Sequence, residues 1–110
     1  MEIIETKQKE ISIFKLNGRL DSNTSPGLEE KLASAMDGGT RDMVLDFENL
    51  DYISSAGLRI ILKTTKDLKR NDGHIILCAM QDYVKEVFEI AGFDSFLPIV
   101  PSLDDAIAKL

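Results

Sequence analysis

Hydrophobic residues follow two different periods along the chain, and the period changes mark the predicted elements. Short apolar or alternating runs of strand length occur at residues 2–6, 11–16, 44–47, 74–80 and 97–100. Between them, apolar residues recur at the i, i+3, i+4, i+7 spacing of one helix face, as in the segment from Leu58 to Leu68. The pattern predicts a β-hairpin followed by alternating helices and strands.

Capping and breaking residues set the predicted helix boundaries. Four helices are expected to begin at Ser25, at Ser54 or Ser55, at Asp82 and at Ser102. The first three are expected to end at Gly38, near Gly73 and at Gly92. Ser25 is predicted as a cap because proline follows it, and proline suits the first helical position.

The alternation after the hairpin predicts parallel pairing by right-handed crossovers. We therefore expect an α/β fold with a mixed, mostly parallel sheet of four to five strands and about four helices. Gly18 marks either a bulge or the end of pairing in the second strand, and Pro98 favours an edge position for the last. Residues 21–25, 48–57 and 80–83 all follow strands, so they are expected to meet at the carboxyl edge of the sheet, and His74 to lie at the opposite edge.

Length and charge restrict the function further. The 110 residues suffice for one domain, with 44% hydrophobic and 29% charged residues, and no apolar run approaches bilayer-spanning length. There are 13 Lys and Arg residues against 19 Asp and Glu, a net charge of -6, which opposes binding to nucleic acid or to an anionic membrane. We expect a cytoplasmic domain with a protein partner or small ligand. Cys78 is the only cysteine and is predicted to be buried.

Ser54 and Ser55 stand where the central strand gives way to a helix. A helix N-terminus favours a negative group, including a phosphate on a serine. Gly57 would allow a partner to approach the backbone of the first turn. The alternative is structural: Ser54 only caps the helix, and Gly57 only relieves crowding against the sheet.

Known catalytic arrangements are not evident, so no enzyme activity and no cofactor are expected. The segment from Ile53 to Gly57 lacks the first glycine of a nucleophile elbow, and the only histidine is predicted at the far edge. The phosphate-binding glycine motifs are missing, and one His with one Cys cannot form a zinc site. Asp21, Asp46 and Asp51 could converge on a magnesium ion, although solvated turn residues are the commoner explanation.

Three segments, in the expected order, resemble the STAS domain family and in particular bacterial anti-sigma factor antagonists. The most specific is Asp46 to Leu58, read as DFENLDYISSAGL. Gly18 to Asp21 is similar to the family's G-x-[LI]-D, and Val84 to Phe93 to its third helix. The resemblance extends over nearly the whole chain and implies a single STAS domain over residues 1–110.

The resemblance implies a partner-switching protein. The serine matching Ser55 is phosphorylated in that family by an anti-sigma factor that is also a serine kinase, and the unmodified antagonist binds this kinase and releases a sigma factor. The family usually has Asp before that serine; Ser54 stands there in this chain and is the alternative acceptor. A phosphatase is a further possible partner, and the oligomeric state is left open.

The expected partner-binding surface lies at the carboxyl edge of the sheet. Its residues are Asp21, Ser22, Asn23, Thr24, Asp51, Tyr52, Ile53, Ser54, Ser55, Ala56, Gly57 and Arg59. Two other functions stay open from the sequence. One is a STAS scaffold without phosphorylation, for example in a larger regulatory or lipid-transport complex, and the other is a nucleotide-binding or weakly hydrolytic domain.

Overall fold

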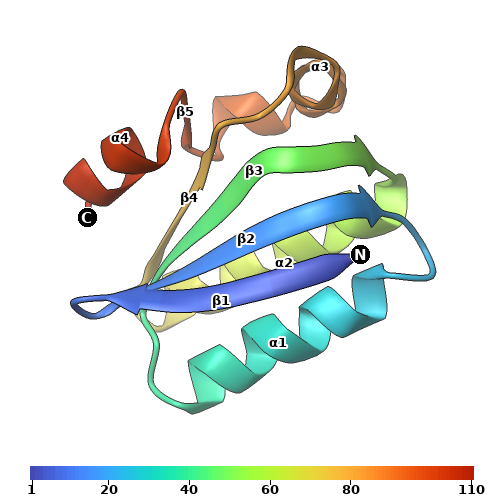
Figure 1. The fold of residues 1–110 in the computed structure, drawn as a ribbon. Helices are drawn as coiled ribbons and strands as arrows, with labels where there is room; N and C mark the ends of the chain where they lie inside the picture. The colour runs from blue at the N-terminus through green and yellow to red at the C-terminus, as the bar shows by residue number, and fades with distance from the viewer.

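The chain begins with an antiparallel hairpin, as predicted (Figure 1). In the computed structural model, which describes residues 1–110, β1 (Glu2–Gln8) pairs with β2 (Ile11–Leu20) from Glu2 opposite Asn17 to Gln8 opposite Ile11. The turn contains Lys9 in a left-handed conformation with φ 58°. Both strands are longer than the periodicity alone predicted.

Three further strands run parallel to β2. They are β3 (Asp42–Ile53), β4 (His74–Cys78) and β5 (Ile99–Val100), and the sheet order is β1-β2-β3-β4-β5. The mixed, mostly parallel sheet is confirmed, and β5 occupies an edge, as Pro98 predicted. β4 ends at Cys78 and β5 begins at Ile99, so both are shorter than expected.

The helices are distributed unequally over the two faces of the sheet (Figure 1). They are α1 (Ser25–Asp37), α2 (Ser55–Arg70), α3 (Asp82–Ile90) and α4 (Leu103–Ala108), with a 3₁₀ turn, η1 (Phe93–Ser95). α1, α2 and α3 pack on one face around Phe14, Leu45 and Phe47. α4 alone covers part of the other, where Ala106 packs with Ile13, Val44 and Ile76. Burial on both faces explains why β4 is apolar almost throughout.

The largest correction concerns β3, which continues to Ile53 where a loop beginning at Glu48 was expected. β2 continues beside it, so that Gly18 lies opposite Leu50 and Leu20 opposite Ile53. The register shifts twice, between Lys15 and Asn17 and between Gly18 and Arg19. Gly18 has φ 108° and marks a bulge within a continuing strand rather than its end.

Two helix starts also differ from the prediction. Thr24 is the N-cap of α1, and the Ser25 hydroxyl instead donates to the Asp21 carbonyl at 2.6 Å. Gln81 is the N-cap of α3, which places Asp82 in the first turn. Ser54 and Ser102 cap α2 and α4 as predicted.

The helical spacing predicts an inward face of α2 that includes Leu62 and Thr65, and the observed face is rotated slightly from it. Thr64 is buried, whereas Leu62 and Thr65 are only half-buried. His74 lies at the amino edge of the sheet, opposite the carboxyl edge, as predicted, because it begins β4 beside Asp42.

Candidate functional site

The ends of β2 and β3 meet at the carboxyl edge of the sheet, whereas β4 ends earlier, at Cys78 opposite Asp46. The Ser54 N–H donates to the Leu20 carbonyl at 2.9 Å, which joins the start of α2 to the end of β2. The Gln81 side chain donates to the Glu48 carbonyl at 3.2 Å and joins the β4–α3 connection to β3. The predicted meeting is therefore confirmed for the β2–α1 turn and the start of α2, and it is wrong for residues 80–83, because Gln81 contacts β3 at Glu48, five residues before the end of that strand.

Asp21 organises the turn between β2 and α1. Its Oδ1 accepts hydrogen bonds from the N–H groups of Asn23 at 2.9 Å and Thr24 at 3.1 Å. The Thr24 hydroxyl accepts from the Asp21 N–H at 2.9 Å and donates to the Arg19 carbonyl at 2.8 Å. The pKa of the Asp21 carboxyl lies below its usual value. The main cause is the hydrogen bond from the Thr24 N–H, and Asn23 and Arg19 contribute less. The turn is therefore shaped by a charged carboxylate.

Arg19 and Tyr52 form an additional exposed pair beside this turn. They lie opposite each other on β2 and β3, and the Arg19 guanidinium carbon is 4.2 Å from the centre of the Tyr52 ring, a cation–π contact. Tyr52 was expected at the surface, but Arg19 was not among the expected residues. Only the shifted register beyond the Gly18 bulge shows that these two residues face each other.

The two serines at the start of α2 have different environments. Ser54 is half-buried in an extended conformation, and its Oγ accepts from the Gly57 N–H at 3.4 Å. Ser55 is the first residue of α2, is exposed, and has no side-chain hydrogen bond within the protein. The Ser54 hydroxyl thus caps the helix, and the Ser55 hydroxyl is free for a partner.

Ile53 and Gly57 do not belong to the accessible surface, which corrects the expected partner-binding set. Ile53 is 4% exposed and packs in the main core. Gly57 is buried, and a Cβ there would lie 2.8 Å from Leu20 Cγ and 3.0 Å from Ile53 Cγ1. The absence of a side chain at Gly57 therefore serves close packing of α2 on the sheet, the structural alternative considered above.

The other expected residues are at least partly accessible and form one surface, here called the carboxyl-edge surface. The exposed members are Ser22, Asn23, Asp51, Tyr52, Ser55 and Arg59, and the half-buried members are Asp21, Thr24, Ser54 and Ala56. They come from the β2–α1 turn, the end of β3 and the first turns of α2. Most of them present polar groups to solvent, and Tyr52 adds an aromatic ring.

The three carboxylates considered for magnesium do not form a common site. Asp46 is buried and its Oδ1 accepts from the Glu48 N–H at 3.0 Å, while the Asp21 carboxylate is engaged in its turn. Asp51 is exposed, and the structure contains no cluster of three or more potential metal-binding side chains. This alternative receives no support.

The only cysteine, Cys78, and the only histidine, His74, are also separated from Ser55. His74 lies at the amino edge, where its Nδ1 is 3.2 Å from Asp42 Oδ1. Cys78 is fully buried, and burial, together with the charges of Asp46 and Glu48, raises the pKa of its thiol to about 12. Its sulfur stays protonated and serves packing, as predicted. None of the helices is both long enough and apolar enough to span a bilayer.

Comparison with known proteins agrees with this architecture. A family model described as STAS domain matches residues 2–106. The Bordetella bronchiseptica protein named "Putative anti-sigma factor antagonist BtrV" is 42% identical over 108 residues, covering 98% of this chain and 93% of that protein. The anti-sigma-B factor antagonist of Staphylococcus aureus is 33% identical over 99 residues, covering 90% of this chain and 92% of that protein.

The fold is also shared with the Bacillus anti-sigma factor antagonist SpoIIAA, which has been solved in two forms. The unphosphorylated form has a TM-score of 0.85 at 22% identity, covering 98% of this chain and 95% of that one. The phosphorylated form has a TM-score of 0.78 at 21% identity, covering 98% of both chains. The family match and the two curated relatives together show that this chain belongs to the STAS domain family, among relatives named anti-sigma factor antagonists.

Proposed function

We propose that this chain is an anti-sigma factor antagonist switched by phosphorylation of Ser55. In its unmodified state it binds an anti-sigma factor that is also a serine kinase, and so releases a sigma factor. The observation that carries the proposal is the exposed, unbonded Ser55 hydroxyl at the first position of the 16-residue helix α2.

The geometry favours Ser55 over Ser54 as the acceptor. A kinase must reach the hydroxyl and deprotonate it during transfer, and Ser55 offers its hydroxyl without breaking an internal bond. To present its hydroxyl to a kinase, the half-buried Ser54 would have to leave its position as the acceptor of the Gly57 N–H. Ser54 itself supplies the oxygen acceptor that an Asp at this position would also supply, so its presence is compatible with the switch.

A phosphate on Ser55 can be accommodated by the folded domain while opposing partner binding. It would add about -1.5 to -2 charge at the positive end of α2, where a negative group is favoured. The same charge would lie within the carboxyl-edge surface, to which the exposed Tyr52 and Asp51 also belong. A partner docked there would have to desolvate the phosphate, and an acidic patch on it would be repelled. The existence of SpoIIAA in both forms supports the view that this fold tolerates the modification.

The test uses a serine kinase anti-sigma factor encoded in the same genome, with ATP, and intact-mass and peptide mass spectrometry. We expect one phosphate on the wild-type protein, located at Ser55, and none on Ser55→Ala. Ser54→Ala serves as the matched control and should still be modified. Phosphate on Ser54, or an unmodified wild-type protein, would contradict the proposed switch.

Binding is measured by calorimetry with the same kinase. The unmodified protein and Ser55→Ala should both bind, and phosphorylation should weaken binding at least about thirtyfold, the loss expected when a charge is buried unpaired in an interface. Equal binding of both forms would show that the phosphate does not control the complex. An unmodified protein recovered from its host with a transport or scaffold complex would support the scaffold function instead.

A further inference from the structure

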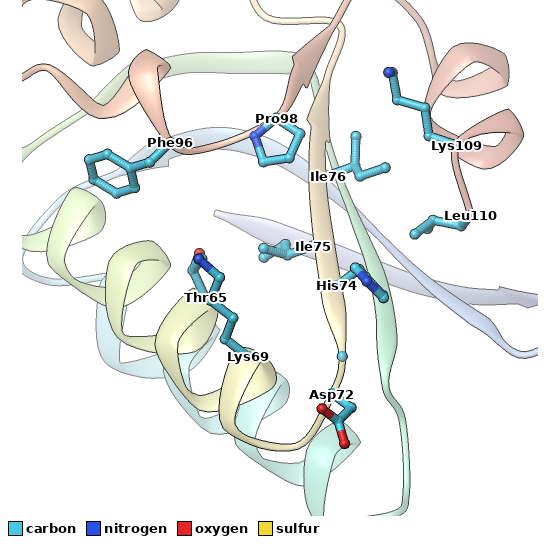
Figure 2. Close-up of a pocket in the computed structure, with 11 residues that line it drawn as sticks. Thr65, Lys69, Asp72, His74, Ile75, Ile76, Phe96, Pro98, Lys109 and Leu110 are labelled. Carbon is cyan, nitrogen blue, oxygen red and sulfur yellow. The ribbon is translucent and has the colours of Figure 1, made fainter.

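The amino-terminal half of β4 has no neighbouring strand on the β5 side. β5 pairs only with Leu77 and Cys78, so His74–Ile76 are bounded by β3 on one side and by a pocket of about 660 Å³ on the other. Figure 2 shows this pocket beside β4, between α2 and the end of α4. It is at the opposite end of the sheet from Ser55.

Main-chain groups of Ile75 point into this open side. Hydrogen-bond direction alternates along a strand whose two neighbours are both parallel. The Leu77 N–H donates to the Pro98 carbonyl at 2.9 Å, toward β5, whereas the His74 N–H donates to the Arg41 carbonyl at 2.8 Å, on the β3 side. Ile75 lies two residues before Leu77, so its N–H and C=O face the pocket.

Proline and a local turn leave those groups without a main-chain partner. Continued parallel pairing would bond the Ile75 C=O to the N–H of residue 98, but Pro98 has none. The Ile75 N–H does not reach the Phe96 carbonyl, which is the next acceptor in the ladder, and the Leu97 N–H is already bonded to the Phe93 carbonyl at 2.9 Å. One donor and one acceptor of a strand edge therefore lack a main-chain partner at the wall of the pocket, in a residue that is itself 4% exposed.

Side chains line the pocket on both faces of the sheet, as a bound strand with alternating side chains would require. Thr65 and Lys69 of α2 line the pocket on one face of the sheet, and Lys109 and Leu110, after α4, line it on the other (Figure 2). The exposed ring of Phe96 forms the end near β5. Successive residues of an extended segment beside Ile75 would point to the two faces in turn.

The charged side chains that line the pocket favour a ligand with acidic residues. Lys69 and Lys109 are exposed and take part in none of the three ion pairs of the structure. His74 is held by Asp42, and Asp72 is the only acidic side chain in the lining. The two lysines place positive charge on both faces of the sheet at this pocket, in a chain of net charge -6.

We propose that this open edge of β4, lined by Lys69 and Lys109, binds an extended acidic segment of a protein partner by strand addition. The Ile75 N–H and C=O supply the main-chain hydrogen bonds, and the two lysines bind carboxylates on alternate side chains. This site is independent of the phosphorylation of Ser55.

The test is an NMR titration of the full chain with an acetylated, amidated hexapeptide of alternating glutamate and valine. We expect saturable shifts of the amide resonances of Ile75, Lys69 and Lys109. The same peptide N-methylated on alternate amides should bind about tenfold more weakly, because it loses main-chain hydrogen bonds. The double variant Lys69→Glu, Lys109→Glu should lose about tenfold for the acidic peptide, and Lys66→Glu, outside the lining on α2, should lose none.

Four results would overturn the proposal. They are no saturable shift at Ile75, equal affinity for the N-methylated peptide, the same shifts with acetate alone, and the same shifts on raising the protein concentration without peptide. The third would indicate a site for small anions, and the fourth a contact between two copies of this chain.

Discussion

Gly57 of α2 lies directly against Leu20, the last residue of β2. A Cβ added at Gly57 would be 2.8 Å from Leu20 Cγ, and the Leu20 side chain is fully buried. The Leu20 carbonyl also accepts the Ser54 N–H at 2.9 Å. The position of Ser55 relative to the Asp21 turn is therefore fixed by packing and by a hydrogen bond.

The first prediction concerns this contact. Gly57→Ala would gain up to about 1 kcal/mol in helix propensity but overpack a buried leucine, which costs about 1 to 3 kcal/mol. We expect the free energy of unfolding to fall by about 1 kcal/mol in urea denaturation. Gly27→Ala in α1 is the matched control, because nothing lies within 4 Å of its added Cβ, and it should be neutral or stabilising. A stabilised Gly57→Ala protein would show that the start of α2 is loosely packed.

The second prediction separates the two serines by stability. Ser54→Ala should lower the free energy of unfolding by about 1 kcal/mol, because the Gly57 N–H loses its acceptor. Ser55→Ala should change it by less than about 0.5 kcal/mol, since its hydroxyl has no internal bond. Ser54→Asp should retain the cap. Equal losses for both alanine variants in urea denaturation would contradict the assignment of Ser54 as the cap.

The third prediction concerns Arg59, one turn after Ser55 on the same helix. Arg59 is exposed and belongs to no ion pair, so a phosphate on Ser55 would meet it at the i, i+4 spacing. Protein carrying phosphoserine at position 55, made by semisynthesis, should be stabilised by the modification. In Arg59→Ala that gain should shrink by about 0.5 kcal/mol in thermal unfolding.

Lys66→Ala is the control for this pair, since Lys66 lies too far along α2 to reach the phosphate. The Arg59 contribution should decline with added salt, because the pair is exposed. If phosphorylation stabilises the wild type and Arg59→Ala equally, Arg59 does not bind the phosphate.

The fourth prediction follows from the Asp21 carboxylate. Its pKa is lowered from 3.8 in the folded state, chiefly by the Thr24 N–H, so folding favours the charged form. The resulting stability is present above the unfolded pKa of about 3.9 and is lost as the pH falls through the lower folded pKa. We expect wild type to exceed Asp21→Asn in unfolding free energy at pH 7, with the difference disappearing in strong acid. A difference that is constant from pH 7 to pH 2 would exclude the charge as its cause.

The fold was largely predictable because its signals are local and repeated. The i, i+3, i+4 spacing marked α2, and the apolar run of β4 marked a strand covered on both faces. Ser54 and Ser102 were recognisable as caps from their place before each helix. His74 could be placed at the far edge because parallel strands share one direction.

The features that were missed depend on distant parts of the chain. Residues 48–53 are too polar to predict a strand, and they form one because β2 continues beside them past the Gly18 bulge. The same register shift creates the Arg19–Tyr52 contact. Gly57 could equally have admitted a partner or packed against the sheet, and only the position of Leu20 decides between these roles.

The length of α2 also determines how independent the two ends of the domain are. Its 16 residues span about 24 Å at 1.5 Å per residue, from Ser55 to the turn that carries Lys69. The Debye length in physiological salt is about 8 Å, so roughly three screening lengths separate a phosphate at one end from the lysines at the other. Little direct electrostatic interaction is therefore left between a phosphate on Ser55 and Lys69, and we expect each end of the domain to bind its partner independently of the other.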